Sequence, residues 1–409
     1  MASDTTYVIV GASLAGAKAA EALRGAGYDG RLVLLGDERE RPYERPPLSK
    51  ELLKGEKGRE KVFVHEEGWY AEHDVDLRLG TVATALHRGD GVVELAGGER
   101  LPYDRLLLTT GSSPRRLDVA GGGLEGIHYL RRLGQAEALR DTFAGGGSVV
   151  VVGGGWIGLE VAAAARHHGV DVVLVEPQPT PLYGVLGREV GDIFAARHRD
   201  RGVDLRTGLG VDAFEGDGTR VTGVRTSDGS VIETGLVLVG VGIVPNTRLA
   251  EQAGLEVDNG IVVDEMLRTS DPDVYAAGDV ASADNPLLGT RLRVEHWANA
   301  ANQGKAAGAS MAGAGEPYAK LPYFFTDQYD LSMEYHGYVD RDGADQVVLR
   351  GDPSGDGAWC AFWLRDGRVL AGMNVNDWDA ADGIKRLARE RAEVDPASLG
   401  DPGTPLADL

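Results

Sequence analysis

Cysteine is almost absent from this chain of 409 residues, which contains a single one, Cys360. One thiol forms no intrachain disulfide and supplies neither a four-cysteine zinc site nor an iron–sulfur cluster. The sequence therefore excludes a disulfide-stapled scaffold and an enzyme that uses two redox cysteines of one chain. It fits a reducing compartment, and we expect a cytoplasmic protein. Cys360 stands in an apolar stretch, where a small core residue is expected.

Long apolar runs and excess positive charge are also lacking. No run approaches the roughly 18 apolar residues of a membrane span, and the first residues lack the basic segment of a signal peptide. The net charge is -21, from 63 acidic and 42 basic residues, so nucleic acid is not an expected partner. The nine histidines show no spacing typical of a metal site, and none is predicted.

Glycine, in contrast, is abundant, with 59 residues. Two glycine-rich turns occur at equivalent places in an internal duplication of the sequence. Each copy has an apolar run, a glycine-rich turn, an alanine-rich stretch and a second apolar run that ends at an acidic residue. This order predicts a strand, a turn, a helix and a second strand, followed in each copy by a hairpin and a returning strand. The first copy comprises residues 7–10, 11–16, 32–35 and 92–111, and the second 149–152, 153–158, 172–175 and 221–240.

The first turn, residues 11–16, is typical of a dinucleotide-binding site. Gly11 and Gly16 fit the fingerprint in which glycines let a diphosphate approach backbone amides at a helix N-terminus. Ser13 stands where the middle glycine belongs. Asp37 follows the second apolar run, where a carboxylate can accept ribose hydroxyls. The alternative is a packing turn before an alanine-rich helix.

The second turn carries the complete fingerprint at Gly153, Gly155 and Gly158. Glu176 ends the following run. An acidic residue there accepts a ribose 2′-hydroxyl and repels a 2′-phosphate, which predicts a preference for NADH over NADPH. Two nucleotide sites in one chain indicate a relay in which hydride from NADH reaches a second bound cofactor, and a flavin is the natural acceptor.

The remaining chain follows a different pattern. After an apolar segment at residues 274–279 we expect a long helix at 298–312, a linker at 313–322, strands at 347–349, 359–364 and 369–375, a helix at 380–392 and a loose tail from 395. The predicted fold is therefore α/β, with two Rossmann-like dinucleotide-binding domains and a C-terminal α+β domain. The predicted boundaries are 1–112 with 243–321 for the FAD domain, 113–242 for the NAD domain and 322–409 for the C-terminal domain.

Five motifs resemble those of the FAD-dependent pyridine nucleotide oxidoreductases, in the ferredoxin reductase group that serves monooxygenases and dioxygenases. They lie at residues 45–50, 109–112, 153–160, 276–279 and 325–329. This family shares a glutathione reductase-like fold. The resemblance implies that Lys50 lies near flavin N5 with Glu160 as its partner, and these two are the catalytic candidates.

The same resemblance implies which residues bind the cofactors. The residues implied for FAD are Gly11, Ser13, Ala15, Gly16, Asp37, Arg45, Lys50, Ala83, Thr110, Gly111, Arg131, Gly278, Asp279 and Trp297. The residues implied for NAD are Gly153, Gly155, Trp156, Ile157, Gly158, Glu160, Glu176 and Gly242.

The activity implied is hydride transfer from NADH to FAD, followed by single-electron transfer to a small iron–sulfur ferredoxin that serves an oxygenase. Rubredoxin, monodehydroascorbate or oxygen as acceptor, or a non-catalytic flavoprotein that senses NADH, are the alternatives. We expect a monomer or weak dimer. Candidate basic residues for docking an acidic ferredoxin are Arg39, Arg41, Arg45, Lys54, Lys57, Arg291, Arg293, Lys305, Lys385, Arg386 and Arg389.

Overall fold

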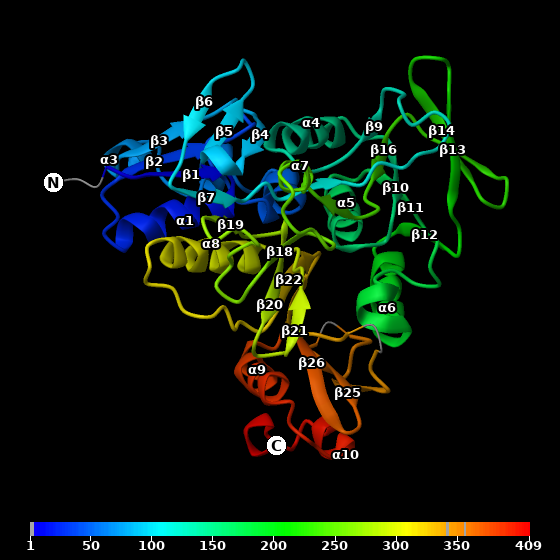
Figure 1. The fold of residues 1–409 in the computed structure, drawn as a ribbon. Coiled ribbons are helices and arrows are strands. Elements are labelled where there is room, and N and C mark those ends of the chain that lie inside the picture. The colour runs from blue at the N-terminus through cyan, green and yellow to red at the C-terminus, as the bar shows by residue number, and fades with distance from the viewer. Residues whose placement is uncertain (1–3, 341–342, 356) are drawn as a thin grey trace. The chain divides into compact units, whose positions relative to one another are not determined.

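The computed structural model describes residues 4–340, 343–355 and 357–409. The chain forms two compact units, each assembled from three separate segments. Unit 1 comprises Met1–Glu44, Arg59–Ser113 and Val244–Pro322, and unit 2 comprises Arg45–Gly58, Pro114–Ile243 and Tyr323–Leu409. The division into FAD, NAD and C-terminal domains remains a prediction. Figure 1 shows the elements of both units, which are described here one unit at a time.

Unit 1 is built on a parallel sheet of five strands in the order β19-β7-β1-β2-β3. Its central residues are fully buried, as Val8 and Ile9 are. A parallel sheet is covered on both faces, which explains why its inner strands read as continuous apolar runs. Its strands are β1 (Thr6–Val10), β2 (Arg31–Leu35), β3 (Val75–Arg78), β7 (Arg105–Leu108) and β19 (Val274–Ala276).

Two long helices of unit 1, α1 (Leu14–Gly25) and α8 (Trp297–Met311), lie side by side (Figure 1). Their backbones approach so closely that a Cβ on Gly304 would stand 2.3 Å from the Ala15 carbonyl oxygen. A Cβ on Gly308 would stand 2.5 Å from the carbonyl oxygen of Ala19. The alanine- and glycine-rich composition of both helices is therefore a packing requirement.

Smaller sheets and short helices complete unit 1. An antiparallel sheet contains β4 (Ala83–His87), β5 (Val92–Leu95) and β6 (Arg100–Pro102), and a second small sheet contains β18 (Ile261–Val263), β20 (Ala281–Asn285) and β21 (Thr290–Leu292). The short helices are η2 (Arg59–Val62), α3 (Trp69–Glu72), η3 (Arg88–Asp90) and α7 (Arg248–Gln252). The strands β8 (Ser112–Pro114) and β17 (Ile243–Pro245) stand where the chain passes from one unit to the other.

Unit 2 repeats the same parallel topology, with the order β12-β11-β10-β16-β9. Four strands have a counterpart in unit 1: β10 corresponds to β1, β11 to β2, β12 to β3 and β16 to β7. The outer strand β9 precedes β10 in the chain, whereas β19 follows β7. The predicted duplication and the Rossmann-like α/β fold are confirmed. The strands are β9 (Ile127–His128), β10 (Ser148–Val152), β11 (Asp171–Glu176), β12 (Val203–Thr207) and β16 (Val237–Val239), and the excursion is β13 (Val211–Gly216), β14 (Val221–Thr226) and β15 (Val231–Glu233).

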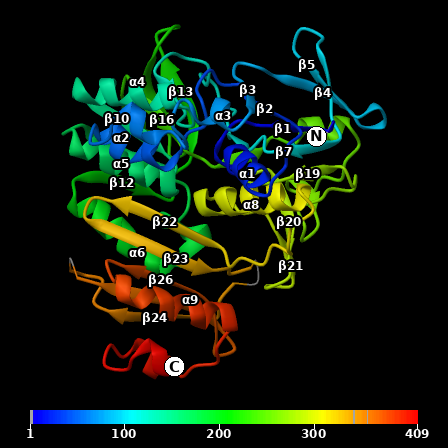
Figure 2. The same cartoon turned by 90° about the vertical axis from the view of Figure 1, so that its left-hand side faces the viewer.

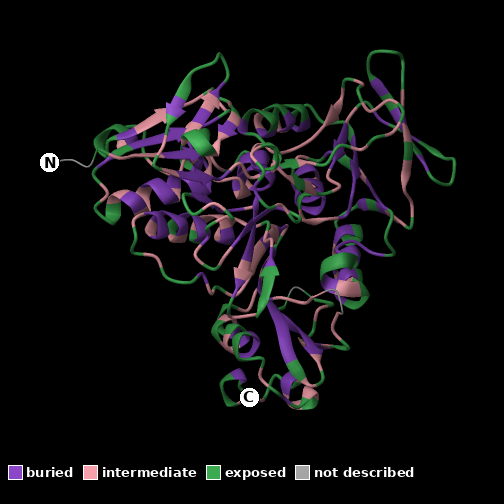
Figure 3. Ribbon diagram, viewed as in Figure 1, coloured by how far each residue is buried: buried purple, intermediate pink, exposed green. Residues whose placement is uncertain are grey.

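Helices flank this sheet, and its central strands β10 and β11 are mostly buried, with an exposed first residue in each (Figure 3). The helices of this part of unit 2 are η1 (Pro46–Ser49), α2 (Glu51–Lys54), α4 (Leu133–Ala144), α5 (Trp156–His167) and α6 (Tyr183–Asp200). The segment with η1 and α2 comes from the N-terminal quarter of the chain, yet it packs on α4 and α5. Leu53 joins the core of this unit.

The C-terminal part of unit 2 is an antiparallel sheet in the order β22-β23-β26-β25-β24 (Figure 2). The three strands expected from apolar runs are present, together with two that were not predicted. Helix α9 (Ala381–Glu390) packs on β26 and β23. The strands are β22 (Tyr323–Gln328), β23 (Leu331–Gly337), β24 (Gln346–Gly351), β25 (Trp359–Arg365) and β26 (Arg368–Val375).

The expectation of a loose C-terminal tail is wrong. Residues after α9 form the helices α10 (Pro396–Gly400) and η5 (Leu406–Asp408), and Leu399 is fully buried. The short helix η4 (Trp378–Ala380) directly precedes α9. The Arg350 guanidinium donates to four carbonyl oxygens of this segment, those of Leu399, Asp401, Pro402 and Thr404. One long-range cation thus anchors a segment whose composition is typical of a loop.

Cys360 lies on β25 and is 1% exposed, which confirms the expected core position. Burial raises the pKa of its thiol to about 12, so it remains protonated. Within the part of the chain that the structure describes, no helix has the length and apolar character needed to cross a bilayer.

Candidate dinucleotide and redox site

The two glycine-rich turns have the same geometry. Gly11 has a φ of +123°, and a Cβ there would stand 2.1 Å from the Thr109 carbonyl oxygen. Gly153 has a φ of +104°, with the Gly240 carbonyl oxygen at 2.4 Å from a built Cβ. In both copies, therefore, the first glycine lets the end of the first strand approach the returning strand.

The third glycine of each turn is also required by packing. A Cβ on Gly16 would stand 2.1 Å from the Gly11 carbonyl oxygen, and one on Gly158 would stand 2.0 Å from that of Gly153. Both contacts are with backbone, which cannot move aside. Each helix therefore begins directly against its own turn.

The middle position differs, and this explains the serine. Gly155 is the N-cap of α5 with ordinary extended backbone, and a Cβ there would meet nothing within 4 Å. Ser13 occupies the equivalent N-cap of α1. The fold itself has room for a side chain at this position. Only a ligand at the helix N-terminus would therefore contact such a side chain.

The helix starts fit the diphosphate of a dinucleotide. The first N–H groups of α1 and α5 have no acceptor within the helix, and the helix dipole places positive charge there. The space outside Gly155 is open to a bound group. The residues present therefore fit FAD at one turn and NAD at the other.

The acidic residues after the second strands are not in equivalent positions. In register, Val10 pairs with Leu35 and Val152 pairs with Val175, so Gly36 is the counterpart of Glu176. Asp37 comes one residue later and is exposed. Glu176 is 8% exposed. Its carboxylate accepts hydrogen bonds from the Gly154 amide at 2.6 Å and the Gln178 amide at 2.8 Å. These bonds fix the carboxylate beside the second glycine-rich turn.

Several predicted FAD residues gather at the carboxyl ends of β1, β7 and β19. Thr110 exchanges hydrogen bonds with Asn246, one through its hydroxyl and one through its carbonyl, each at 2.8 Å. Gly278 has a φ of +82°, with Ala15 Cβ 3.2 Å from a built Cβ. Sheets of this type bind ligands outside their carboxyl edge, so the placement suits a nucleotide.

The other predicted FAD residues of unit 1 are more widely placed. Trp297 is the first residue of α8 and is half-buried, and His296 is its N-cap. The Asp279 carbonyl oxygen accepts from Arg293 at 3.2 Å. Gly111 follows Thr110, and Ala83 begins β4.

Three residues predicted to contact FAD lie in unit 2 instead. Arg45 donates to the carbonyl oxygen of Arg131, and Lys50 follows η1. Among the predicted NAD residues, Trp156 packs 5.0 Å from the Phe324 ring centroid, Ile157 is 43% exposed, and Gly242 is exposed with a φ of +97°.

The predicted Lys50–Glu160 pair is brought together within unit 2. Lys50 Nζ lies 2.8 Å from Glu160 Oε1, and the two residues are 4% and 3% exposed. The ammonium also stands 5.1 Å from the centre of the Phe325 ring. A buried ion pair needs further hydrogen bonds to offset its desolvation, and Glu160 has them. Its Oε1 accepts from the Thr326 hydroxyl at 2.6 Å and its Oε2 from that of Ser49.

Sequence reasoning did not single out these two hydroxyl donors. Ser49 and Thr326 were present in the motifs at 45–50 and 325–329, but only as members of the pattern. Their partner is 111 residues away from Ser49 and 166 from Thr326, so the contact is visible only in the folded chain. Beyond Thr326 the polar contacts continue to Gln328 and His198.

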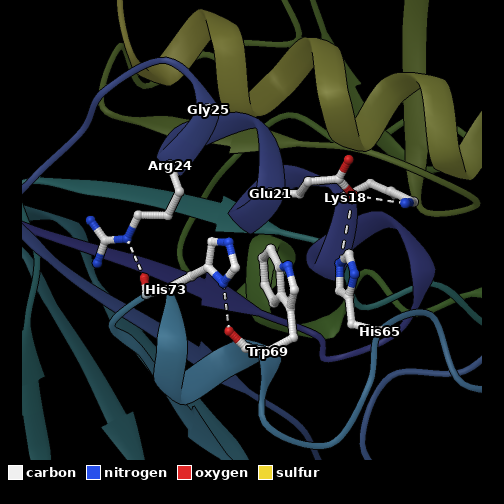
Figure 4. A pocket seen from close by; sticks show the side chains of 7 residues that line it. All are labelled: Lys18, Glu21, Arg24, Gly25, His65, Trp69 and His73. Carbon is white, nitrogen blue, oxygen red and sulfur yellow. Dashed lines mark hydrogen bonds and ion pairs between the residues drawn. The ribbon is translucent and has the colours of Figure 1, made fainter.

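A surface cavity of about 600 Å³ lies elsewhere on unit 1 (Figure 4). Its wall holds a stack of three rings, in which the Trp69 ring lies 3.8 Å from that of His65 and 4.2 Å from that of His73. Lys18 and Glu21 form an ion pair on α1 at its rim. None of these residues belongs to the predicted cofactor sites.

Comparisons with known proteins agree with this geometry. A model of the pyridine nucleotide-disulphide oxidoreductase family matches residues 5–304, and a model of the reductase C-terminal family matches 323–409. The anthranilate 1,2-dioxygenase system ferredoxin–NAD(+) reductase component of Burkholderia cepacia is 41% identical over 408 residues, covering 98% of each chain.

Solved structures of reductases are also similar to this chain over nearly its whole length. The reductase in the covalent putidaredoxin reductase–putidaredoxin complex has a TM-score of 0.95 and 37% identity, covering 99% of this chain and 98% of that one. The ferredoxin reductase for the CYP199A2 system of Rhodopseudomonas palustris has a TM-score of 0.94 and 35% identity, covering 99% of each chain.

Proposed function

The chain belongs to the pyridine nucleotide-disulphide oxidoreductase family, and from that membership we propose that it is an FAD-dependent, NADH-dependent ferredoxin reductase. The observation that carries this proposal is the pair of geometrically equivalent dinucleotide turns in one chain, with a buried Lys50–Glu160 pair in the unit of the second turn. Relatives named as ferredoxin reductases of oxygenase systems support it over nearly the whole length.

We assign FAD to the first turn and NADH to the second. The bound FAD would supply the chemistry, accepting a hydride from NADH and releasing its two electrons one at a time. The residues of the chain would bind the two cofactors, orient them and shield them from water. Gly11, Gly16 and the start of α1 hold a diphosphate, Asp279 and Trp297 border the remainder of the flavin, and Lys50 offers a fixed positive charge at the reacting end.

A thiol relay is not part of this proposal. The single cysteine, Cys360, is 1% exposed on β25, and burial raises the pKa of its thiol to about 12. Electrons would therefore leave without a cysteine intermediate, directly to a one-electron carrier. We propose a small iron–sulfur ferredoxin of an oxygenase system as that carrier, and a cytoplasmic location in keeping with a single reduced thiol.

Anaerobic stopped-flow of the FAD-loaded protein tests this function. Mixing with NADH should bleach the flavin absorption, and adding an oxidised [2Fe–2S] ferredoxin should restore it. Failure to bleach with NADH contradicts the reductase proposal itself. Bleaching by NADH without recovery on adding the ferredoxin contradicts the proposal that a ferredoxin is the electron acceptor. The same assay with rubredoxin, monodehydroascorbate and oxygen then identifies the acceptor that serves, and no recovery with any of them favours an NADH sensor.

We also propose that Glu176 selects NADH. Its carboxylate is fixed by two backbone amides beside the second turn, where it would accept ribose hydroxyls and repel a 2′-phosphate. Glu176→Arg should raise the ratio of kcat/KM for NADPH to that for NADH by about tenfold or more, which corresponds to roughly 1.4 kcal/mol. The matched control is Glu233→Arg on the exposed end of β15. An unchanged ratio in Glu176→Arg contradicts the assignment.

A further inference from the structure

A line of polar side chains extends from Glu160 into the core of unit 2. The Thr326 hydroxyl lies 2.6 Å from Glu160 Oε1, and Gln328 Nε2 lies 3.2 Å from Thr326 Oγ1. His198 Nε2 lies 2.9 Å from Gln328 Oε1, and the Tyr329 hydroxyl lies 3.1 Å from His198 Nδ1. Four hydrogen bonds thus connect the ion pair to a histidine on α6 and a tyrosine just beyond β22.

These side chains are buried where polar groups are costly. Thr326 and His198 are 0% exposed and Gln328 is 1% exposed. A buried polar group without a partner destabilises a fold, so a connected line of this kind persists only when each member is paired. Tyr329 is half-buried at the outer end, with the Arg201 guanidinium 5.5 Å from its ring centre.

The charge on Glu160 fixes the direction of every bond in the line. Paired with Lys50, the carboxylate can only accept, so Thr326 must donate to it. Thr326 Oγ1 must then accept from the amide nitrogen of Gln328, which turns the amide oxygen toward His198. His198 must donate from Nε2, and its Nδ1 must accept from the Tyr329 hydroxyl. All four donors therefore point toward Glu160.

We propose that His198 is a positioning residue for the Lys50–Glu160 pair, acting through Gln328 and Thr326 to hold the carboxylate in the orientation that receives Lys50. The proposal rests on the proposed function, which places that pair at the reacting end of the cofactors. His198 touches neither Glu160 nor Lys50 itself. Its part is to orient the Gln328 amide, so that Thr326 has its proton free for Glu160.

The arrangement suits orientation and not proton transfer. An amide group in the middle of the line does not readily pass a proton, whereas a chain of aligned donors strengthens each successive bond. Burial lowers the pKa of His198 to about 4, so the ring is neutral near pH 7 and holds the single tautomer that the line requires. Oε1 of Glu160 is thereby shared between Thr326 and Lys50, while Ser49 holds Oε2.

The tautomer of His198 is the first test, and it needs no turnover. In protein labelled with ¹⁵N-histidine, the His198 ring should carry its proton on Nε2 and have an unprotonated Nδ1 at pH 7. The signal is assigned by its loss in His198→Gln. Thr326→Val, which removes the donor to Glu160 with little change in shape, should shift that signal. A proton on Nδ1, or an imidazolium, overturns the proposal.

Single-turnover kinetics of the FAD-loaded protein form the second test. His198→Leu should slow hydride transfer from NADH about tenfold while the dissociation constant for NADH changes less than about twofold. His198→Gln, whose amide nitrogen can replace Nε2 as the donor, should restore the rate to within about twofold of the parent. Tyr329→Phe, which removes only the outer hydroxyl, should have a smaller effect than His198→Leu.

The control for Tyr329→Phe is Tyr323→Phe, which removes a hydroxyl bonded to Glu334 outside the line. If His198→Leu does not fold, two variants of Thr326 replace it. Thr326→Val removes the hydroxyl donor to Glu160 and should slow hydride transfer, whereas Thr326→Ser keeps the donor and should not. Equal hydride-transfer rates in these variants and the parent overturn the positioning role. A parent that transfers no hydride from NADH contradicts the proposed function instead, and the tautomer test then still decides the direction of the line.

Discussion

The three glycines of a dinucleotide turn have different physical reasons for being there. The first and third face backbone oxygens at distances that no Cβ can occupy, in both copies. The middle one faces open space at Gly155, and serine replaces it at position 13. A motif that reads as one pattern in sequence therefore divides into two residues required by the fold and one that only a ligand can require.

Alanine substitutions in the second turn should separate these two roles. Gly155→Ala should leave thermal stability unchanged and weaken NADH binding, because the added methyl group meets only the bound dinucleotide. Gly158→Ala should lower the melting temperature by several degrees, since its Cβ would stand 2.0 Å from the Gly153 carbonyl oxygen. Thermal unfolding and NADH titration of both variants measure this. A Gly155→Ala protein that binds NADH normally contradicts the placement of the ligand.

His198 should make the stability of the protein depend on pH. Its pKa is about 4 in the folded protein, against an ordinary value of 6.5, because burial disfavours the charged ring. Between these values the unfolded chain binds a proton that the native chain does not, so stability is present above pH 6.5 and falls as the pH drops toward 4. The loss attributable to this group approaches about 3 kcal/mol.

His198→Gln should flatten that dependence, because glutamine does not titrate. Urea unfolding of parent and variant between pH 4 and 7 gives the difference, from which the contributions of other titrating groups cancel. His128→Gln is the matched control, since it makes the same substitution at a ring that is only half-buried. Parallel curves for the parent and His198→Gln would contradict a neutral buried ring.

At the scale of elements, the sequence predicts those that are uniform in character. The inner strands of both parallel sheets are mostly continuous apolar runs, whereas the edge strands β3 and β12 carry charged residues and were not predicted. Helix α8 was expected at 298–312 and found at Trp297–Met311. Strand β22 was missed because it contains Thr326, Asp327 and Gln328, whose polarity conceals a strand. Its strand partner is the neighbouring β23, whereas the residues that make it part of the candidate site are more than a hundred residues away, on α5 and α6.

The order of the C-terminal tail was also not predicted, because the residue that holds it lies elsewhere in the sequence. Its order depends on Arg350, which is on β24 and supplies a planar fork of donors to four carbonyl oxygens. Arg350→Lys should keep the charge but lose most of these bonds, and amide hydrogen exchange in residues 396–409 should accelerate about tenfold or more. Arg368→Lys, which disturbs an exposed ion pair with Glu393, is the control. Unchanged exchange would mean that buried Leu399 is sufficient to hold the tail.

At the scale of the whole molecule, the proposed docking of an acidic ferredoxin on a chain of net charge -21 would depend on local cations. Several of the predicted candidates are already engaged: Arg291 with Asp284, and Arg293 with Glu295. Arg386 donates to the tail carbonyls of Leu406 and Leu409. Lys385 and Arg389 are exposed on α9 and are the candidates that remain on that helix.

Reversing both charges should therefore weaken docking and spare the flavin chemistry. The Lys385→Glu/Arg389→Glu protein should reduce ferredoxin with a kcat/KM lowered about tenfold or more at low salt, because mutual repulsion replaces steering. Its reduction of ferricyanide by NADH should match the parent, and its ferredoxin rate should depend less steeply on ionic strength, because screening has less attraction to remove. Arg248→Glu/Arg220→Glu, which reverses two exposed charges outside the candidate set and changes the net charge equally, is the control. Equal losses in the control would show a response to net charge, and unchanged ferredoxin reduction would place docking on another face.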